Sequence, residues 1–279
     1  MSQSEKASRL LALHHAKQPL LLINAWDAAS ASIVEHAGFP AIATTSAGVA
    51  NAQGYPDGQH IPWPEMLEVI RRIAETVRVP VTADVEAGFA ADLQQLEWAL
   101  EQLVEAGAVG INLEDAVPGA AHGPLFSLAD QANRIRTVRR ISERLKLHLV
   151  INARTDAYWQ KGAEPAAAWH ETLERGKAYF DAGADCIFIP GLRDPEKIGD
   201  LVAAWKSPIN ILAGPGVPSI ADLQKLGVRR ISFGSGPMRA AMGFLRNICQ
   251  EALDSGAYNK MVETAVTYDE MNALLAAGK

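Results

Sequence analysis

Acidic side chains stand at the ends of three consecutive apolar segments of this sequence. Asp84 and Glu86 close the segment that begins at Val81, and Glu114 closes the next one. Side chains of an extended segment alternate between two faces, so the apolar residues take one face and the polar residues the other. The polar face then carries Thr82, Asp84, Glu86, Asn112, Glu114, Asn152, Arg154 and Asp156. We expect the acidic members of this set to lie close together.

Several carboxylates buried in one place are costly unless a cation or a proton neutralises them. The set contains a single arginine, Arg154, which cannot balance so many acids. A hard divalent ion held by oxygen ligands can do so. The chain has no cysteine or histidine spacing of the zinc type, which favours Mg2+, or else Mn2+. The alternative is a buried ion-pair network around Arg154 without a metal.

Loops elsewhere in the chain could add further groups, each with a plainer explanation. The small residues Ser46-Ala47-Gly48 could hold a carboxylate through backbone N–H groups, or simply form a tight turn. Asp57 lies in a polar Pro-Asp-Gly loop that could reach the site, although such loops are usually only turns. His122 lies in a Gly-rich loop that could act as a lid, but a lone loop histidine is more often solvated. The glycines at 214–216 and 234–236 could bind phosphate or serve close packing.

A regular series of strands and helices must position these residues. Short β-branched runs alternate with amphipathic segments, whose starts carry caps such as Asp27 and Asp194-Pro195 and which often end in glycine. The strand candidates are Leu20–Asn24, Ala41–Thr45, Val81–Val85, Val109–Leu113, His148–Asn152, Cys186–Ile189, Ile209–Leu212 and Arg230–Phe233.

Eight β-then-α units in a chain of 279 residues predict an α/β fold of the (β/α)8 TIM-barrel type. A doubly wound sheet is the rival, but it seldom uses eight evenly repeated units. No linker-like tract divides the chain, so we expect one domain over residues 1–279, with an extra helix at Ser4–Lys17 and a helical extension from about residue 236. In such barrels chemistry gathers at the carboxyl ends of the strands, where the acidic set would lie.

Composition and charge restrict the class of protein. With 26 Lys+Arg against 32 Asp+Glu the net charge is −6, which argues against a nucleic-acid groove or an anionic-membrane surface. The two cysteines, Cys186 and Cys249, offer no disulfide framework. No apolar run is long enough for a membrane span, and the first residues lack the pattern of a signal peptide. We expect a cytoplasmic protein that acts on or binds a small molecule.

Five motifs together resemble one enzyme family over most of the chain, from about Leu20 to Ala241. They are Ser46-Ala47-Gly48, the stretch from Gly54 to Asp57, the stretch from Val81 to Gly88, the stretch from Gly110 to Asp115, and the stretch from Ile151 to Asp156. The family is the isocitrate lyase and phosphoenolpyruvate mutase superfamily. The resemblance implies an Mg2+-dependent enzyme that acts on 2-oxo acids, or on acids that become them, through an enolate-like intermediate.

The resemblance also implies roles for individual residues. Asp84 would match the direct metal ligand, and Asp57, Glu86 and Glu114 would match acids that hold the ion mostly through water. Arg154 would bind substrate oxygens through its planar, permanently charged guanidinium. The expected substrate-binding residues are Ser46, Ala47, Gly48, Asn112, Arg154 and Asn210, and the expected catalytic residues are Asp57, Glu114, His122 and Arg154. A C-terminal helix swapped between subunits and a homotetramer built as a dimer of dimers are implied as well.

The sequence departs from each branch of this family in its own catalytic groups. The loop after the fourth strand lacks the cysteine of the isocitrate and methylisocitrate lyases and the Lys/Asn pair of the mutase branch. The polar pair of the lyases after Asn210 is replaced by Leu212-Ala213, and Ser235 stands where oxaloacetate decarboxylases carry a histidine. The substrate is therefore open.

Three functions remain as hypotheses. The first is a C–C bond lyase that cleaves or decarboxylates a small 2-oxo or 2-hydroxy di- or tricarboxylate, with His122, Tyr55 or a metal-bound water as general acid/base. The second is an enzyme that makes or breaks a C–P bond, as phosphoenolpyruvate mutase and phosphonopyruvate hydrolase do. The third is a 2-oxo-acid binding protein with little turnover.

Overall fold

The computed structural model describes residues 1–119, 123–162 and 164–276, and its strands form one parallel barrel. The strands are β1 (Leu20–Leu22), β2 (Asn24–Ala25), β3 (Ile42–Thr44), β4 (Val81–Asp84), β5 (Gly110–Glu114), β6 (Val150–Arg154), β7 (Cys186–Phe188), β8 (Ile209–Leu212) and β9 (Arg230–Ser232). β1 pairs with β9 and β2 with β3. Since only Ile23 separates β1 from β2, they are two pieces of one barrel strand. The barrel expected from the sequence is confirmed.

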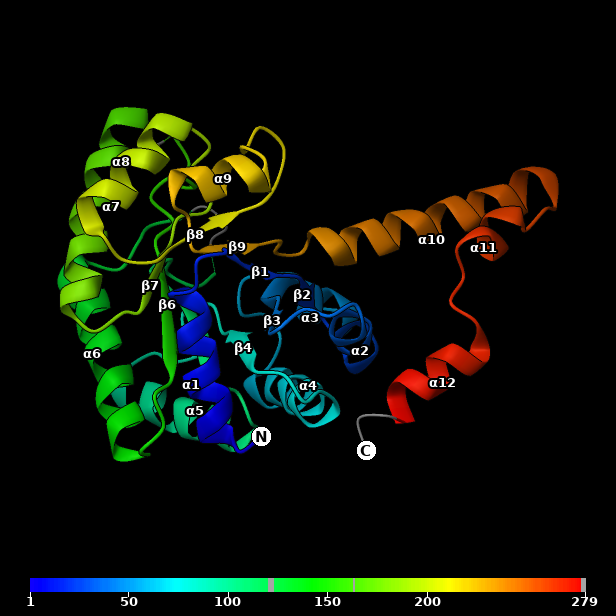
Figure 1. Cartoon of the computed structure of the whole chain (residues 1–279), viewed down its shortest axis with the longest axis horizontal. Helices are drawn as coiled ribbons and strands as arrows, with labels where there is room; N and C mark the ends of the chain where they lie inside the picture. The colour runs from blue at the N-terminus through cyan, green and yellow to red at the C-terminus, as the bar shows by residue number, and fades with distance from the viewer. Residues whose placement is uncertain (120–122, 163, 277–279) are drawn as a thin grey trace.

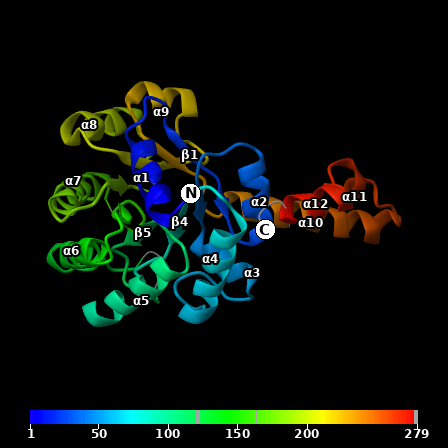
Figure 2. The ribbon, with the colours of Figure 1, turned by 60° about the horizontal axis from the view of Figure 1, so that its bottom comes forward.

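Helices cover the outer face of the barrel, as Figures 1 and 2 show. The helices of the described residues, including those that lie away from the outer face, are α1 (Gln3–His14), α2 (Ala28–His36), α3 (Ser46–Ala52), α4 (Trp63–Thr76), α5 (Leu93–Glu105), α6 (Leu128–Arg144), α7 (Pro165–Asp181), α8 (Pro195–Trp205), α9 (Ile220–Leu226), α10 (Gly236–Ser255), α11 (Asn259–Glu263) and α12 (Tyr268–Ala276). Side-chain caps begin many of them; Asp27, for example, accepts from the backbone N–H of Ser30. The capping residues Asp27 and Asp194, recognised in the sequence, are therefore the N-caps of α2 and α8.

Most strand boundaries differ from the sequence-based expectation by one residue, and the differences at β6 and α1 are larger. The sixth labelled strand begins at Val150 and includes Arg154, whereas the sequence suggested that it starts at His148. The His148 imidazole is instead half-exposed and bonds the Asp185 carboxylate. The first helix ends at His14, three residues before the expected Lys17, and the backbone N–H of its C-cap residue His15 bonds the carbonyl oxygens of Ala12 and Leu13.

Helix α1 closes the bottom of the barrel, at the amino ends of the strands. Its Leu10 is fully buried and packs with Leu20, Leu22 and Val109. Gly110 of β5 lies directly above it, and a Cβ at that position would come within 2.8 Å of Leu10 Cδ2. The same Cβ would also lie 2.9 Å from Thr82 Oγ1 and 3.1 Å from the Val150 carbonyl oxygen, so the helix and the neighbouring strands together disfavour a side chain at residue 110.

The C-terminal helices form an arm that leaves the barrel (Figures 1 and 2). Helix α10 follows β9 but points outward, and Met238 near its start is its buried residue. Helix α12 returns to contact α2. The helical extension expected from about residue 236 is confirmed. Among the described residues, none of the helices has the length and apolar character required to cross a membrane.

Candidate active site

A cavity of about 370 Å³ opens at the carboxyl ends of the strands and has both acidic and basic side chains in its wall. A second cavity of about 240 Å³ adjoins it and shares Ser46, Asp57, Arg154 and Trp159 with it. The expected residues Ala47, Asp84 and Asn112 line the first cavity, and Glu86 and Glu114 line the second. Together the two cavities fall within the usual size range of small-molecule sites.

Asp84 is held rigidly at the end of β4. Its Oδ2 accepts hydrogen bonds from the Ser46 backbone N–H (3.1 Å) and hydroxyl (2.9 Å), and its own N–H donates to Thr44 Oγ1 (2.9 Å). The other carboxylate oxygen, Oδ1, is buried and has no partner among the described residues. Because a buried carboxylate oxygen normally has a donor or a cation, this atom is the strongest sign of an absent ligand.

Two further acids approach Asp84 from a strand end and from a loop. Glu86 is 4% exposed, and its φ of +49° is a strained backbone for a non-glycine residue. Burial, and then the charges of Asp57 and Asp84, raise the pKa of Glu86 to about 8. Burial and the charge of Asp84 also raise the pKa of Asp57. The charge of Asp84 thus opposes ionisation of both Asp57 and Glu86.

Arg154 balances two of the acids. Its Nε and Nη2 donate to the two oxygens of Asp156 at 2.6 and 2.7 Å, and its Nη1 lies 2.7 Å from Glu114 Oε2. Burial raises the pKa of Glu114, and the adjacent Arg154 opposes that shift. The guanidinium also lies over the Trp159 ring, 4.9 Å from its centroid. A guanidinium has five N–H donors, so two remain for a ligand.

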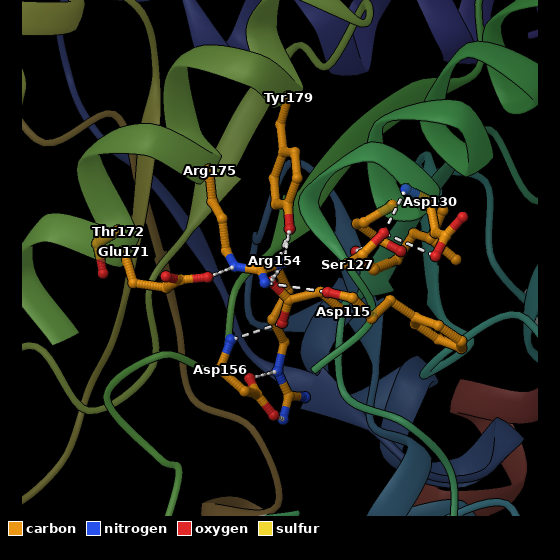
Figure 3. A network of polar contacts seen from close by, with 12 residues as sticks. Asp115, Ser127, Asp130, Arg154, Asp156, Glu171, Thr172, Arg175 and Tyr179 are labelled. Atoms are coloured by element: carbon orange, nitrogen blue, oxygen red, sulfur yellow. Dashed lines mark hydrogen bonds and ion pairs between the residues drawn. The ribbon is translucent and has the colours of Figure 1, made fainter. Parts of the chain in front are cut away.

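A buried polar layer outside the barrel supports this arginine (Figure 3). Asp115 Oδ1 accepts from the Asp156 backbone N–H at 2.9 Å, and its Oδ2 accepts from Tyr179 (2.7 Å) and Arg175 (3.2 Å). Burial raises the Asp115 pKa and Arg175 opposes it, whereas burial and Asp115 both raise the Tyr179 pKa. The layer fixes the backbone that carries Arg154 and Asp156.

Some expected residues lie elsewhere. Gly48 does not line the cavity, and its N–H bonds Thr45 Oγ1. Asn210 is fully buried below the cavity and donates to Ser232 Oγ at 3.1 Å. Tyr55 donates to Glu65 at the surface. His122 lies outside the described residues.

Several cavity residues were missed by the sequence analysis. Arg193 and Arg239 line the first cavity and His60 lines the second. Arg193 follows β7 after a short loop and Arg239 lies in the first turns of α10, just after β9, positions that could have drawn attention to them. His60 lies three residues beyond Asp57 in the same loop, and a histidine beside a carboxylate cluster is a candidate proton carrier.

The donor set fits a hard divalent ion. Asp84 Oδ1 and Glu86 Oε1 are buried oxygens without partners among the described residues. Among the described residues, no three Asp, Glu, His or Cys side chains lie close enough together to bind one metal ion directly. One direct carboxylate ligand, with the remaining acids reached through water, agrees with both observations and with the coordination that Mg2+ prefers.

The fold and the acidic mouth define an α/β-barrel protein with a cluster of carboxylates at the carboxyl ends of its strands. Residues 10–253 match the family model described as phosphoenolpyruvate phosphomutase, and the chain belongs to this family, within the isocitrate lyase/phosphoenolpyruvate mutase superfamily.

Relatives in this superfamily include enzymes of different reaction types. The chain is 27% identical to 2,3-dimethylmalate lyase of Eubacterium barkeri over 98% of this chain and 95% of that one. It is similar to a Burkholderia cenocepacia J2315 crystal structure provisionally named a phosphonomutase, with 37% identity, a TM-score of 0.85 and coverage of 90% and 100%. A phosphonopyruvate hydrolase solved with oxalate and Mg2+ shares 25% identity, with a TM-score of 0.84 and coverage of 98% and 95%.

Proposed function

We propose that this protein is an Mg2+-dependent C–C bond lyase that cleaves or decarboxylates a small 2-oxo or 2-hydroxy di- or tricarboxylate. One observation carries the proposal: Asp57, Asp84 and Glu86 gather at the barrel mouth. Among the residues that the structure describes, no arginine bonds them, and Asp84 and Glu86 each present a buried oxygen without a partner. The acids that do bond an arginine, Glu114 and Asp156, already use Arg154. A divalent cation, Mg2+ or Mn2+, is the missing countercharge.

The residues around this cluster are suited to hold a 2-oxo acid. The two remaining Arg154 N–H groups and the amide of Asn112 are donors for substrate oxygens. When bound, the ion supplies positive charge near the oxygen on which negative charge develops as the neighbouring bond breaks. The pKa of Glu86 is raised to about 8, so this carboxyl can hold a proton near neutral pH. Burial and the charge of Asp84 raise the pKa of Asp57 as well.

Two further arginines of the cavity favour a second acidic group on the substrate. Arg193 and Arg239 line the first cavity together with Arg154, and neither has an ion-pair partner among the described residues. Three guanidinium groups around one cavity suit a molecule with more than one anionic group. The relative named 2,3-dimethylmalate lyase points to the same class of dicarboxylate.

The cavity also supports a second candidate, an enzyme that acts on a C–P bond. Gly214, Pro215, Gly234 and Gly236 line the same cavity as the two arginines, and their backbones could approach a phosphonate closely. The match to the phosphoenolpyruvate phosphomutase model favours this reading as well. A binding protein with little turnover is the third candidate.

A substrate panel distinguishes the three. Purified protein is incubated with 2-oxo and 2-hydroxy di- and tricarboxylates and with phosphonopyruvate, in Mg2+ and in EDTA. We expect pyruvate or glyoxylate to accumulate from a carboxylate in Mg2+ alone. Release of phosphate from phosphonopyruvate alone would favour the second candidate, and oxalate binding without any turnover would favour the third.

The affinity for Mg2+ should rise with pH. The Glu86 carboxyl, with its pKa of about 8, holds a proton that the ion must displace. The folded state binds that proton more tightly than the unfolded chain, so the metal-free protein loses stability as pH rises from about 4.5 to 8. We expect the rise in Tm caused by Mg2+ to grow between pH 6 and about 8.5. A flat profile, or the same profile in Glu86→Gln, would contradict this.

We also propose that the C-terminal arm is swapped onto a second copy of the chain, in a dimer of dimers. Helix α10 leaves exposed Met242, Phe244 and Leu245, and a groove beside it runs from Asn51 to Arg246. Apolar side chains along a projecting helix are typical of a subunit interface.

Replacing Leu245 with Glu should break this assembly. Light scattering should give about four chain masses for the parent and a lower mass for Leu245→Glu. Leu145→Glu, a comparably exposed leucine at the end of α6, is the matched control and should keep the parent mass. A monomeric parent would refute the swap.

The cytoplasm is our proposed location. Cys186 and Cys249 are free thiols in the structure, the first buried and the second exposed. An exposed free thiol is in keeping with a reducing compartment.

A further inference from the structure

Arg230, at the start of β9, is a fully buried arginine inside the barrel, below the cavity. No carboxylate bonds it among the described residues, and its Nε has no partner there. Burial lowers its pKa to about 10, so it stays charged at neutral pH. A buried cation without a bonded acid is costly, which suggests that it is retained for a purpose other than stability.

Arg230 fixes the orientation of its two hydrogen-bond partners, His14 and Asn112. His14 Nδ1 lies 2.8 Å from the Leu10 carbonyl oxygen, which can only accept, so Nδ1 carries the hydrogen. His14 Nε2 is then an acceptor, and Arg230 Nη1 lies 3.3 Å from it. Arg230 has no acceptor atoms, so the polarity of this contact cannot be reversed.

The same reasoning fixes the amide of Asn112. Arg230 Nη2 donates to Asn112 Oδ1 at 2.9 Å, and Asn152 Nδ2 donates to the same oxygen at 2.8 Å. The amide oxygen must therefore face down toward Arg230. The Asn112 Nδ2 has no hydrogen bond to the described residues, and Asn112 lines the cavity above.

We propose that Arg230 is a positioning residue that turns the amide N–H of Asn112 into the cavity, as a donor to an anionic oxygen of the ligand. Without it, the Asn112 amide could rotate and present its oxygen to the ligand, which would repel a carboxylate or an enolate. The inference rests on the proposed function in taking a 2-oxo acid or its analogue as the ligand.

Oxalate affinity tests the inference, measured by calorimetry at saturating Mg2+. Arg230→Met should weaken oxalate binding about 10- to 100-fold, the range for a lost hydrogen bond to a charged group. Arg230→Lys, which keeps a charged donor, should recover most of the affinity. Arg230→Met should add little to Asn112→Ala in the double variant, because both remove the same donor.

Arg139→Met is the matched control. Arg139 is a half-buried arginine near the bottom of the barrel that bonds Gly183 O and Asp185, so its loss should lower Tm and leave oxalate affinity unchanged. Parent-like oxalate binding in Arg230→Met, or multiplied losses in the double variant, would overturn the inference. If the parent itself binds no oxalate with Mg2+, the proposed function fails instead.

A second variant covers the case in which Arg230→Met does not fold. Asn112→Asp keeps the shape, gives Arg230 a bonded carboxylate and removes the N–H donor. We expect it to fold with an undiminished Tm and to lose oxalate affinity by at least about 10-fold. Unchanged oxalate affinity in Asn112→Asp would overturn the inference.

Discussion

Asp84→Asn is expected to abolish Mg2+ binding and to lower kcat/KM by at least about 100-fold, the usual scale for loss of a group that stabilises developing charge. Asp84 Oδ1 is the buried, unpartnered oxygen of the cluster, and an amide is a weak ligand for a hard cation. The fold should survive because an Asn side-chain oxygen can still accept from Ser46. The Tm in EDTA should be equal to or above that of the parent, since one of the mutually repelling charges is gone.

Calorimetric titration of Mg2+ checks this expectation directly. Asp181→Asn makes the same charge change at an exposed ion pair on α7 and should leave both the titration and kcat/KM unchanged. If Asp84→Asn titrates Mg2+ like the parent, Asp84 is not the ligand.

Arg154→Lys is expected to raise KM, and the Kd of oxalate, by about 10- to 100-fold. An ammonium cannot reproduce the two bonds to Asp156 while also reaching Glu114 and a ligand. The variant should also lose stability, because at least one nearly buried carboxylate is left poorly paired.

Steady-state kinetics with the substrate found in the panel, together with thermal unfolding, measure both effects. Arg71→Lys is the matched control, since Arg71 also bonds a glutamate, Glu68, through two nitrogens, but on the exposed face of α4. An unchanged KM in Arg154→Lys would exclude Arg154 from substrate binding.

The barrel was predictable because its signal is local and repeated. Apolar runs, caps and glycine ends recur along the chain, and side-chain alternation alone placed Asp84, Glu86 and Glu114 at one mouth. The same alternation could have identified Arg230, which shares a face with Ser232 on the last strand.

What the sequence could not supply is the pairing between distant segments. The sequence does not show that Arg154 forms its hydrogen bonds with Asp156 and not with Asp84. It also does not show that His14 of the first helix contacts Arg230. These contacts depend on barrel closure. Arg193 and Arg239 join one cavity wall for the same reason, although 45 residues lie between them in the sequence.

Co-crystallisation with plentiful Mg2+ and oxalate tests the central claim most directly. We expect one Mg2+ ion among the carboxylates of Asp57, Asp84 and Glu86, with Asp84 Oδ1 bound to it directly. Water molecules should lie between the ion and the other acids, and oxalate should occupy its remaining ligand positions. A well-resolved map in which Asp57, Asp84 and Glu86 contact only water and protein donors under those conditions would contradict the account.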